Sequence, residues 1–150
     1  MGTWDIGPFD NDTAADFADD LDEAPAAERV AMVRTALVRA ADTPAAPVEL
    51  DAPVGMVAVA AAALVAARCP GGPPLDTVYA PDEPFPALTP DLRPLAVGAL
   101  DRVVAEGSEL AELWDEEADG RAWRQDVRRL RALLEPEPEP LCLEQTLFDL

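Results

Sequence analysis

The sequence has no histidine and no lysine, and its only serine is Ser108. Without histidine, the chain lacks the usual general base of enzymes and the commonest nitrogen ligand of metal ions. Ser108 has no such base to activate it, and its place before a helical stretch favours helix capping over nucleophilic attack. No phosphate-binding or dinucleotide-binding glycine motif is present. We therefore expect a protein that is not an enzyme and that binds no cofactor.

Cysteines and long apolar runs are also scarce. The two cysteines, Cys69 and Cys142, lie far apart, whereas a small secreted scaffold would carry several pairs. The N-terminus has no basic segment followed by an apolar stretch, so it does not resemble a signal peptide. The longest uncharged run, residues 52–67, is shorter than the ~20 residues that cross a bilayer. We therefore expect a cytoplasmic protein with no membrane association.

Acidic residues dominate the charge. Thirty Asp and Glu residues face eleven arginines, which gives a formal net charge of −19. This charge should repel nucleic acid directly and favours a basic or DNA-binding protein as the partner. One acidic group precedes Arg29, and a second lies between residues 106 and 119. The second contains a row at one-turn spacing: Glu109, Glu112 and Glu116. Such a row could imitate a phosphate backbone, but a solvated helix face is the better explanation.

Apolar residues recur at three- and four-residue spacing through six stretches, whereas no stretch alternates as a strand would. Thr13, Asp51 and Ser108 are expected to cap the first, third and fifth helices. The fold class is therefore predicted to be all-α, a compact bundle of about six helices. We expect them at about residues 13–23, 25–41, 52–68 and 89–106, in a short stretch after Ser108, and at 121–134.

The segments outside these helices differ in character. Residues 1–11 are expected to form an ordered loop that uses Trp4 and Phe9 as apolar anchors, either as a clamp on the core or as a recognition surface, and we favour the clamp. Residues 70–86 are rich in proline and are predicted to form a surface loop. We therefore expect one helical domain over residues 1–134. Residues 135–150 form a tail, whose EPEPEP linker should be extended.

The opening residues MGTWDIGPFDNDTAADFADDL resemble a bacterial family of small domains of unknown function, whose members begin G-T/A-W-G-x-G-x-F-x-N-D-x-A-x-D-[WF]. Asp5 stands where the family has glycine. The resemblance extends over about residues 1–134 and implies a small stand-alone domain without an established activity. The signature residues, which we interpret as structural, are Gly2, Trp4, Gly7, Phe9, Asn11, Asp12 and Asp16.

Two charged groups have alternative interpretations. Asp10, Asp12 and Asp16 offer carboxylates to a divalent cation, but an EF-hand loop would need glycine at Ala15, and helix capping explains the same residues. We therefore predict no metal site. A stripe on the last helix could contact phosphate, but pairing with the protein's own acids is the better interpretation: Arg121, Arg124, Arg128 and Arg131.

The last six residues resemble the short peptides with which bacterial proteins bind the DNA sliding clamp. In this interpretation Gln145 makes the polar contact, while Phe148 and Leu150 fill an apolar pocket beside Leu147. Phe148 departs from the Leu or Met that is usual at its place. The alternative is a tail that packs back onto the core.

These observations together favour a non-catalytic acidic domain that binds another protein as an inhibitor or adaptor. The alternative is a DNA mimic that inhibits a nucleic-acid-processing protein, with a sliding-clamp-binding peptide at its C-terminus. The sequence indicates neither the identity of the partner nor the oligomeric state.

Overall fold

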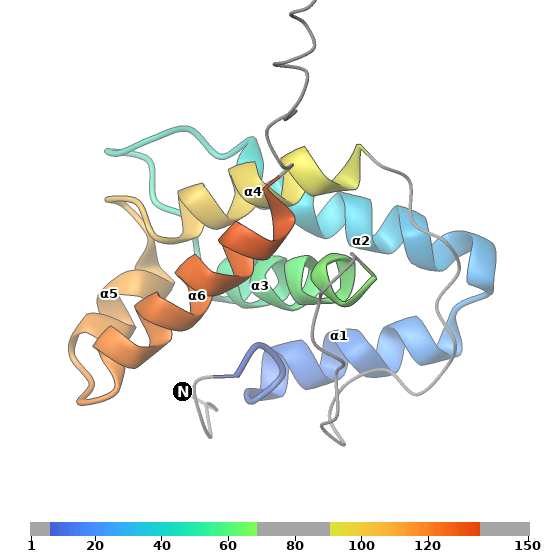
Figure 1. The fold of residues 1–150 in the computed structure, drawn as a ribbon, viewed down its shortest axis with the longest axis horizontal. Helices are drawn as coiled ribbons and strands as arrows, with labels where there is room; N and C mark the ends of the chain where they lie inside the picture. Colours follow the sequence, from blue (N-terminus) through green and yellow to red (C-terminus); the bar gives the residue numbers. More distant parts are fainter. Residues whose placement is uncertain (1–6, 69–90, 136–150) are drawn as a thin grey trace, which may run out of the picture.

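A computed structural model describes residues 7–68 and 91–135, and in these two ranges all regular secondary structure is helical. The prediction of an all-α fold with six helices is confirmed (Figure 1). The opening residues, the proline-rich loop predicted at 70–86 and the tail beyond residue 135 lie outside the described residues. The helices are α1 (Asp12–Glu23), α2 (Ala26–Ala41), α3 (Ala52–Ala67), α4 (Leu92–Val103), α5 (Glu109–Asp115) and α6 (Gly120–Leu134).

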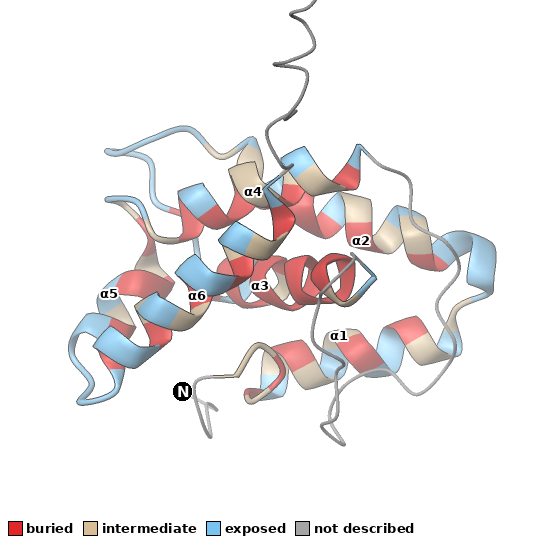
Figure 2. Ribbon diagram, in the orientation of Figure 1, coloured by how far each residue is buried: buried red, intermediate tan, exposed pale blue. Residues whose placement is uncertain are grey.

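Helix α3 occupies the centre of the molecule and is buried on nearly every side (Figure 2). Its sequence is mostly Ala and Val, and these small side chains let the neighbouring helices approach closely. Helices α1, α2, α4, α5 and α6 all contact it. The uniformly apolar character of residues 52–67 thus correctly indicated a central helix. In the described part of the chain, none of the helices is both long and apolar enough to cross a membrane.

Two of the three predicted helix caps are wrong in detail. Helix α1 begins one residue earlier than expected, because Asn11 rather than Thr13 is its N-cap: the Asn11 Oδ1 accepts a hydrogen bond from the Ala14 N–H at 2.7 Å. Asp51 occupies the N-cap position of α3, but its side chain makes no capping hydrogen bond. The prediction for Ser108 is confirmed, since its hydroxyl oxygen accepts from the Ala111 N–H at 3.3 Å.

Helix α4 ends at Val103, three residues before the predicted end. The chain then turns at Gly107, whose φ of +89° favours glycine because a side chain would be strained there. This turn bonds to the segment before α3: the Leu50 N–H donates to the Gly107 carbonyl at 2.7 Å, and the Glu109 N–H donates to the Leu50 carbonyl at 2.9 Å. The start predicted at Thr89 lies outside the described residues.

A buried arginine on α4 holds the connector between α2 and α3 in place. Arg102 is only 7% exposed, and its guanidinium donates only to backbone carbonyls. Because an arginine offers five N–H groups, it can satisfy several carbonyls that no helix pairs. The acceptors are Thr43, Pro44, Val48, Glu106 and Gly107.

Candidate protein-interaction site

A groove runs along the surface between α1 and α2, with a volume of about 490 Å³. We call it the α1–α2 groove. Its base is apolar and is formed by side chains from three helices: Phe17 of α1, Met32 and Ala36 of α2, and Val57 of α3. Phe17, Met32 and Val57 are only half-buried, although each packs against the core. The base of the groove therefore exposes apolar surface that a partner could cover.

Carboxylates line the edges of the same groove. Asp16 and Asp20 stand one turn apart on α1, and Glu28 stands on the first turn of α2. All three are exposed, and among the described residues their side chains form neither a hydrogen bond nor an ion pair. Arg39 lines the groove near the C-terminal end of α2. Among its described lining residues, the groove therefore has three carboxylates and one cation.

A second buried arginine fixes the end of the groove at which α1 turns into α2. Arg29 is 8% exposed, and its Nε donates to the carbonyls of Leu21 at 2.9 Å and Ala24 at 3.1 Å. These carbonyls lie at the C-terminal end of α1, where a helix leaves its last acceptors unpaired. Arg29 thus ties the C-terminal end of α1 to the first turns of α2. No sequence pattern singled out this arginine. Phe17 is the last residue of the N-terminal signature pattern, but its helical spacing predicted an ordinary core residue.

The described signature residues serve mainly the fold. Phe9 is 1% exposed and lies in the core, and Asn11 caps α1. The Gly7 N–H donates to Asp10 Oδ2 at 3.2 Å, and the Asp10 N–H donates to the Gly7 carbonyl at 3.1 Å, which closes a turn. The gap between this turn and the α3, α5 and α6 side chains is only about 10 Å³, so the turn is packed onto the core.

The other signature residues divide between the surface and the undescribed N-terminus. Asp12 is exposed in the first turn of α1, where a carboxylate interacts favourably with the helix dipole. Asp16 is exposed and lines the α1–α2 groove, as does Phe17, the last residue of the signature pattern. Gly2 and Trp4 lie outside the described residues. In residues 7–68 and 91–135, no group of three potential ligands could hold a metal ion.

The predicted acidic row on α5 does not face the solvent as a unit. Glu109 Oε1 accepts a hydrogen bond from the Ala52 N–H at 2.7 Å, so this carboxylate caps α3 in place of Asp51. Glu112 is exposed, and Glu116 follows the last residue of α5 as its C-cap. One carboxylate of the row is therefore part of the fold, and two remain at the surface.

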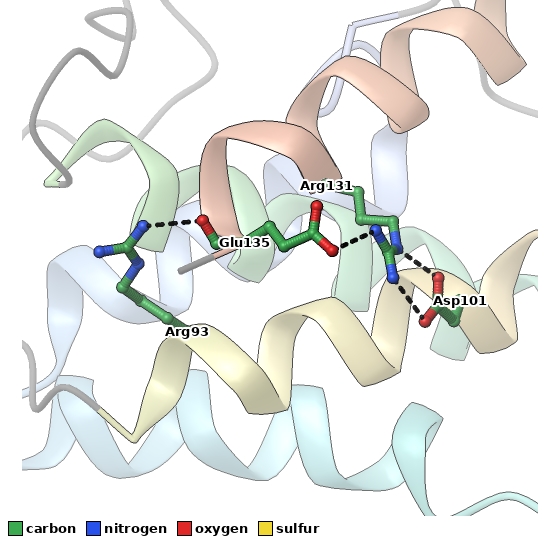
Figure 3. A network of polar contacts seen from close by, with 4 residues as sticks. All are labelled: Arg93, Asp101, Arg131 and Glu135. Atoms are coloured by element: carbon green, nitrogen blue, oxygen red, sulfur yellow. Dashed lines mark hydrogen bonds and ion pairs between the residues drawn. The ribbon is translucent and has the colours of Figure 1, made fainter. Parts of the chain in front are cut away.

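The arginine stripe of α6 pairs with acids of neighbouring segments. Arg124 binds both carboxylate oxygens of Asp115, at 2.8 and 2.9 Å, and this hydrogen bonding lowers the pKa of Asp115 below its ordinary value. Arg131 binds Asp101 at 2.6 Å and Glu135 at 3.2 Å (Figure 3). None of these ion pairs involves an acid of α1. Arg121 and Arg128 are exposed and have no side-chain partner among the described residues.

The end of α6 is held by an arginine outside the stripe. Arg93 of α4 donates to the carbonyls of Leu133, Leu134 and Glu135, the last of which is drawn in Figure 3. These carbonyls lie at the C-terminal end of α6, where no N–H group of the helix donates to them. The side chain thus acts as a C-cap supplied by another helix. Arg29, Arg93 and Arg102 thus all bind backbone carbonyls and serve the fold.

The comparisons with known proteins identify a family but no function. The family model described as a domain of unknown function (DUF4259) matches residues 2–126, and the chain therefore belongs to this family. The match covers all of α1–α5 and the α1–α2 groove, and it ends before the tail. Neither a curated protein nor a solved structure matches the chain.

Proposed function

We propose that this protein is a non-catalytic interaction domain that binds a basic partner protein in the α1–α2 groove, as an inhibitor or an adaptor in the bacterial cytoplasm. The observation that carries the proposal is the combination of an apolar base with the carboxylates of Asp16, Asp20 and Glu28, which have no side-chain partner in residues 7–68 and 91–135. Covering Phe17, Met32 and Val57 would provide the favourable hydrophobic term of binding. The carboxylates would attract a basic partner and disfavour an acidic one.

Nucleic-acid mimicry by α5 receives less support. A mimic needs several carboxylates at regular spacing in solvent, and the row of Glu109, Glu112 and Glu116 loses its first member to the cap of α3. Helix α5 also has only seven residues, so it presents less than two helical turns to a partner. The groove, by contrast, combines charge with apolar surface. We therefore place the partner at α1 and α2.

The C-terminal peptide stays a separate prediction, because it lies outside both the described residues and the family match. If it binds a sliding clamp, a double variant Gln145→Ala and Phe148→Ala should weaken binding of the full chain to purified clamp protein, measured by surface plasmon resonance. Thr146→Ala is the matched control, because the motif assigns no contact to that residue. Equal binding by both variants would exclude this use of the tail.

The groove can be tested by photo-crosslinking followed by measurements on the purified partner. A photoreactive amino acid at Thr35, which is exposed and lines the groove, should capture the partner in host cells. The same amino acid at Ala118, in the exposed turn between α5 and α6, should not. The captured protein is then purified and titrated calorimetrically.

Blocking the groove provides the decisive measurement. Ala31 is exposed and lines the groove, so Ala31→Trp should fill it without disturbing the core. We expect this variant to lower the affinity for the purified partner at least about tenfold, which corresponds to about 1.4 kcal/mol. Ala118→Trp adds the same side chain elsewhere and should leave the affinity unchanged. Equal affinities for the two variants would contradict the proposal.

A further inference from the structure

The walls of the α1–α2 groove restrict the shape of its occupant. Its lining residues on α2 extend from Glu28 to Arg39, which corresponds to about 16 Å along the helix axis. Both walls are helices, whose backbone groups are already paired within each helix. They therefore offer no free edge to an extended peptide, which must satisfy its own N–H and C=O groups. A helical occupant satisfies those groups internally and presents only side chains to the groove.

The base of the groove favours an amphipathic helix. Its half-buried apolar side chains, Phe17, Met32 and Val57, come from three helices, and charged residues of α1 and α2 line the same groove. A helix that lies in the groove would cover these side chains with one stripe of apolar residues at three- and four-residue spacing. Three turns of such a helix, about eleven residues, match the length of the groove.

The charges of the groove favour one orientation of the occupant. Asp20 near the end of α1 and Glu28 at the start of α2 lie on either side of the short turn that joins the two helices, and Asp16 lies one turn before Asp20. Arg39 lines the groove eleven residues beyond Glu28, toward the other end of α2. The basic residues of the occupant should therefore lie toward the α1–α2 turn, and its acidic residues, where present, toward Arg39.

We propose, as an extension of the proposed function, that the occupant of the α1–α2 groove is a single basic amphipathic α-helix of the partner, about three turns long. Its apolar stripe covers Phe17, Met32 and Val57. Its arginines or lysines lie beside the carboxylates of Asp16, Asp20 and Glu28. This arrangement uses the helix-in-groove mode of peptide recognition, with charge selecting the partner and its orientation.

Synthetic peptides test this inference without knowledge of the natural partner. The probe is a fluorescent 14-residue peptide of Leu, Ala and Arg, with Leu along one helical face and Arg toward one end. A scrambled peptide of identical composition has no apolar face. Fluorescence anisotropy with the full-length protein should show saturable binding of the first peptide and at least about tenfold weaker binding of the second. Equal binding of both peptides would reduce the effect to nonspecific charge attraction and overturn the inference.

Two double variants locate the binding. Asp16→Asn with Asp20→Asn removes two carboxylates from the groove and should weaken binding of the amphipathic peptide about tenfold. Asp19→Asn with Glu23→Gln removes two exposed carboxylates from the same helix outside the groove, and it should change binding less than about twofold. Equal losses in the two variants would overturn the inference. Circular dichroism melting verifies that both variants fold.

The outcomes separate this inference from the proposed function. If the amphipathic peptide fails to bind, but Ala31→Trp weakens binding of the purified partner, the groove is an interaction site whose occupant is not a basic helix. If the peptide binds and Ala31→Trp does not weaken its binding, the peptide lies elsewhere and the inference is wrong. If Ala31→Trp weakens binding of both the peptide and the purified partner, both proposals are supported.

Discussion

The two acidic regions of this protein differ in how their carboxylates are used. Around α5, Glu109 caps α3 and Asp115 pairs with Arg124, so these carboxylates are part of the fold. Along the α1–α2 groove, by contrast, Asp16, Asp20 and Glu28 have no side-chain partner among the described residues. Acidic residues at similar local spacing thus stabilise the fold at Glu109 and Asp115, whereas those of the groove remain available to bind a partner.

This difference shows how to interpret an acidic protein. Net charge alone points to no particular surface, because carboxylates bonded within the fold contribute to the total as much as free ones do. The carboxylates that matter for binding are those left unpaired beside exposed apolar surface, and only the α1–α2 groove combines both features among the sites discussed above. Substitutions in the two regions should therefore affect different properties: stability around α4 and α5, and binding along α1 and α2.

The largest loss of stability should come from Arg102, whose guanidinium binds the carbonyls between α2 and α3. Arg102→Met keeps an apolar stem but removes the donors to these part-buried carbonyls. We expect a loss of about 3–5 kcal/mol in the free energy of unfolding, measured by urea denaturation. Arg128→Met removes an exposed arginine and should change stability by less than about 0.5 kcal/mol. Similar values for the two variants would show that the carbonyl contacts contribute little.

Aromatic residues in the two regions should also differ. Trp114 on α5 is 7% exposed and stacks on Trp123 with ring centres 5.8 Å apart, so Trp114→Ala should cost about 3–5 kcal/mol. Phe17 is only half-buried in the groove, and Phe17→Ala should cost about 1–2 kcal/mol. Thermal unfolding followed by circular dichroism measures both. A cost for Phe17→Ala as large as that for Trp114→Ala would assign Phe17 to the core instead of a binding surface.

The sequence predicts the helices well because their signals are local. Apolar residues at helical spacing located all six helices, and a run that is apolar on every side placed α3 at the centre. The capping interaction of Ser108 lies within three residues of chain and was also predicted correctly. The prediction for Thr13 was wrong because Asn11, two residues earlier, offers an equally suitable side chain in an extended conformation.

The candidate site was harder to predict because it depends on contacts between distant residues. Glu109 caps Ala52 across 57 positions, and the acceptors of Arg102 in the connector lie 54–59 positions away. No local pattern encodes such pairings. The groove likewise depends on the angle between α1 and α2, which leaves Phe17 half-buried although its spacing is that of a core residue. The acidity of α1 and the signature positions Asp16 and Phe17 could be recognised in the sequence, but not the groove that they line.

A smaller effect separates two neighbouring glutamates of α5. Glu109→Ala removes the side chain that caps α3 and should lower the free energy of unfolding by about 1 kcal/mol. Glu112→Ala removes an exposed carboxylate from the same helix and should change it by less than about 0.5 kcal/mol. Urea denaturation of both variants provides the comparison. Equal small effects would indicate that Glu109 does not cap α3. The row of Glu109, Glu112 and Glu116 would then be intact, which would support nucleic-acid mimicry.

The smallest effect concerns two aspartates with opposite pKa shifts. Burial raises the pKa of Asp126 on α6, the charge of nearby Asp10 raises it further, and Arg129 opposes the shift. The folded protein therefore holds a proton that the unfolded chain has lost, so stability falls as the pH rises from about 4 through the raised pKa. Asp126→Asn removes this loss. The variant should gain stability relative to the wild type across that range and keep the gain above it.

Asp115 provides the opposite case, because its hydrogen bond from Arg124 lowers its pKa. The stabilisation by ionised Asp115 is fully present above the ordinary pKa of about 4 and is lost as the pH falls through the lowered pKa. Asp115→Asn should therefore be less stable than the wild type at neutral pH, and the two should converge in acid. Urea denaturation between pH 2.5 and 7 measures both variants. For each variant, the quantity compared is its free energy of unfolding relative to the wild type. If this difference changed with pH in the same direction for both variants, burial of Asp126 would not govern its ionisation.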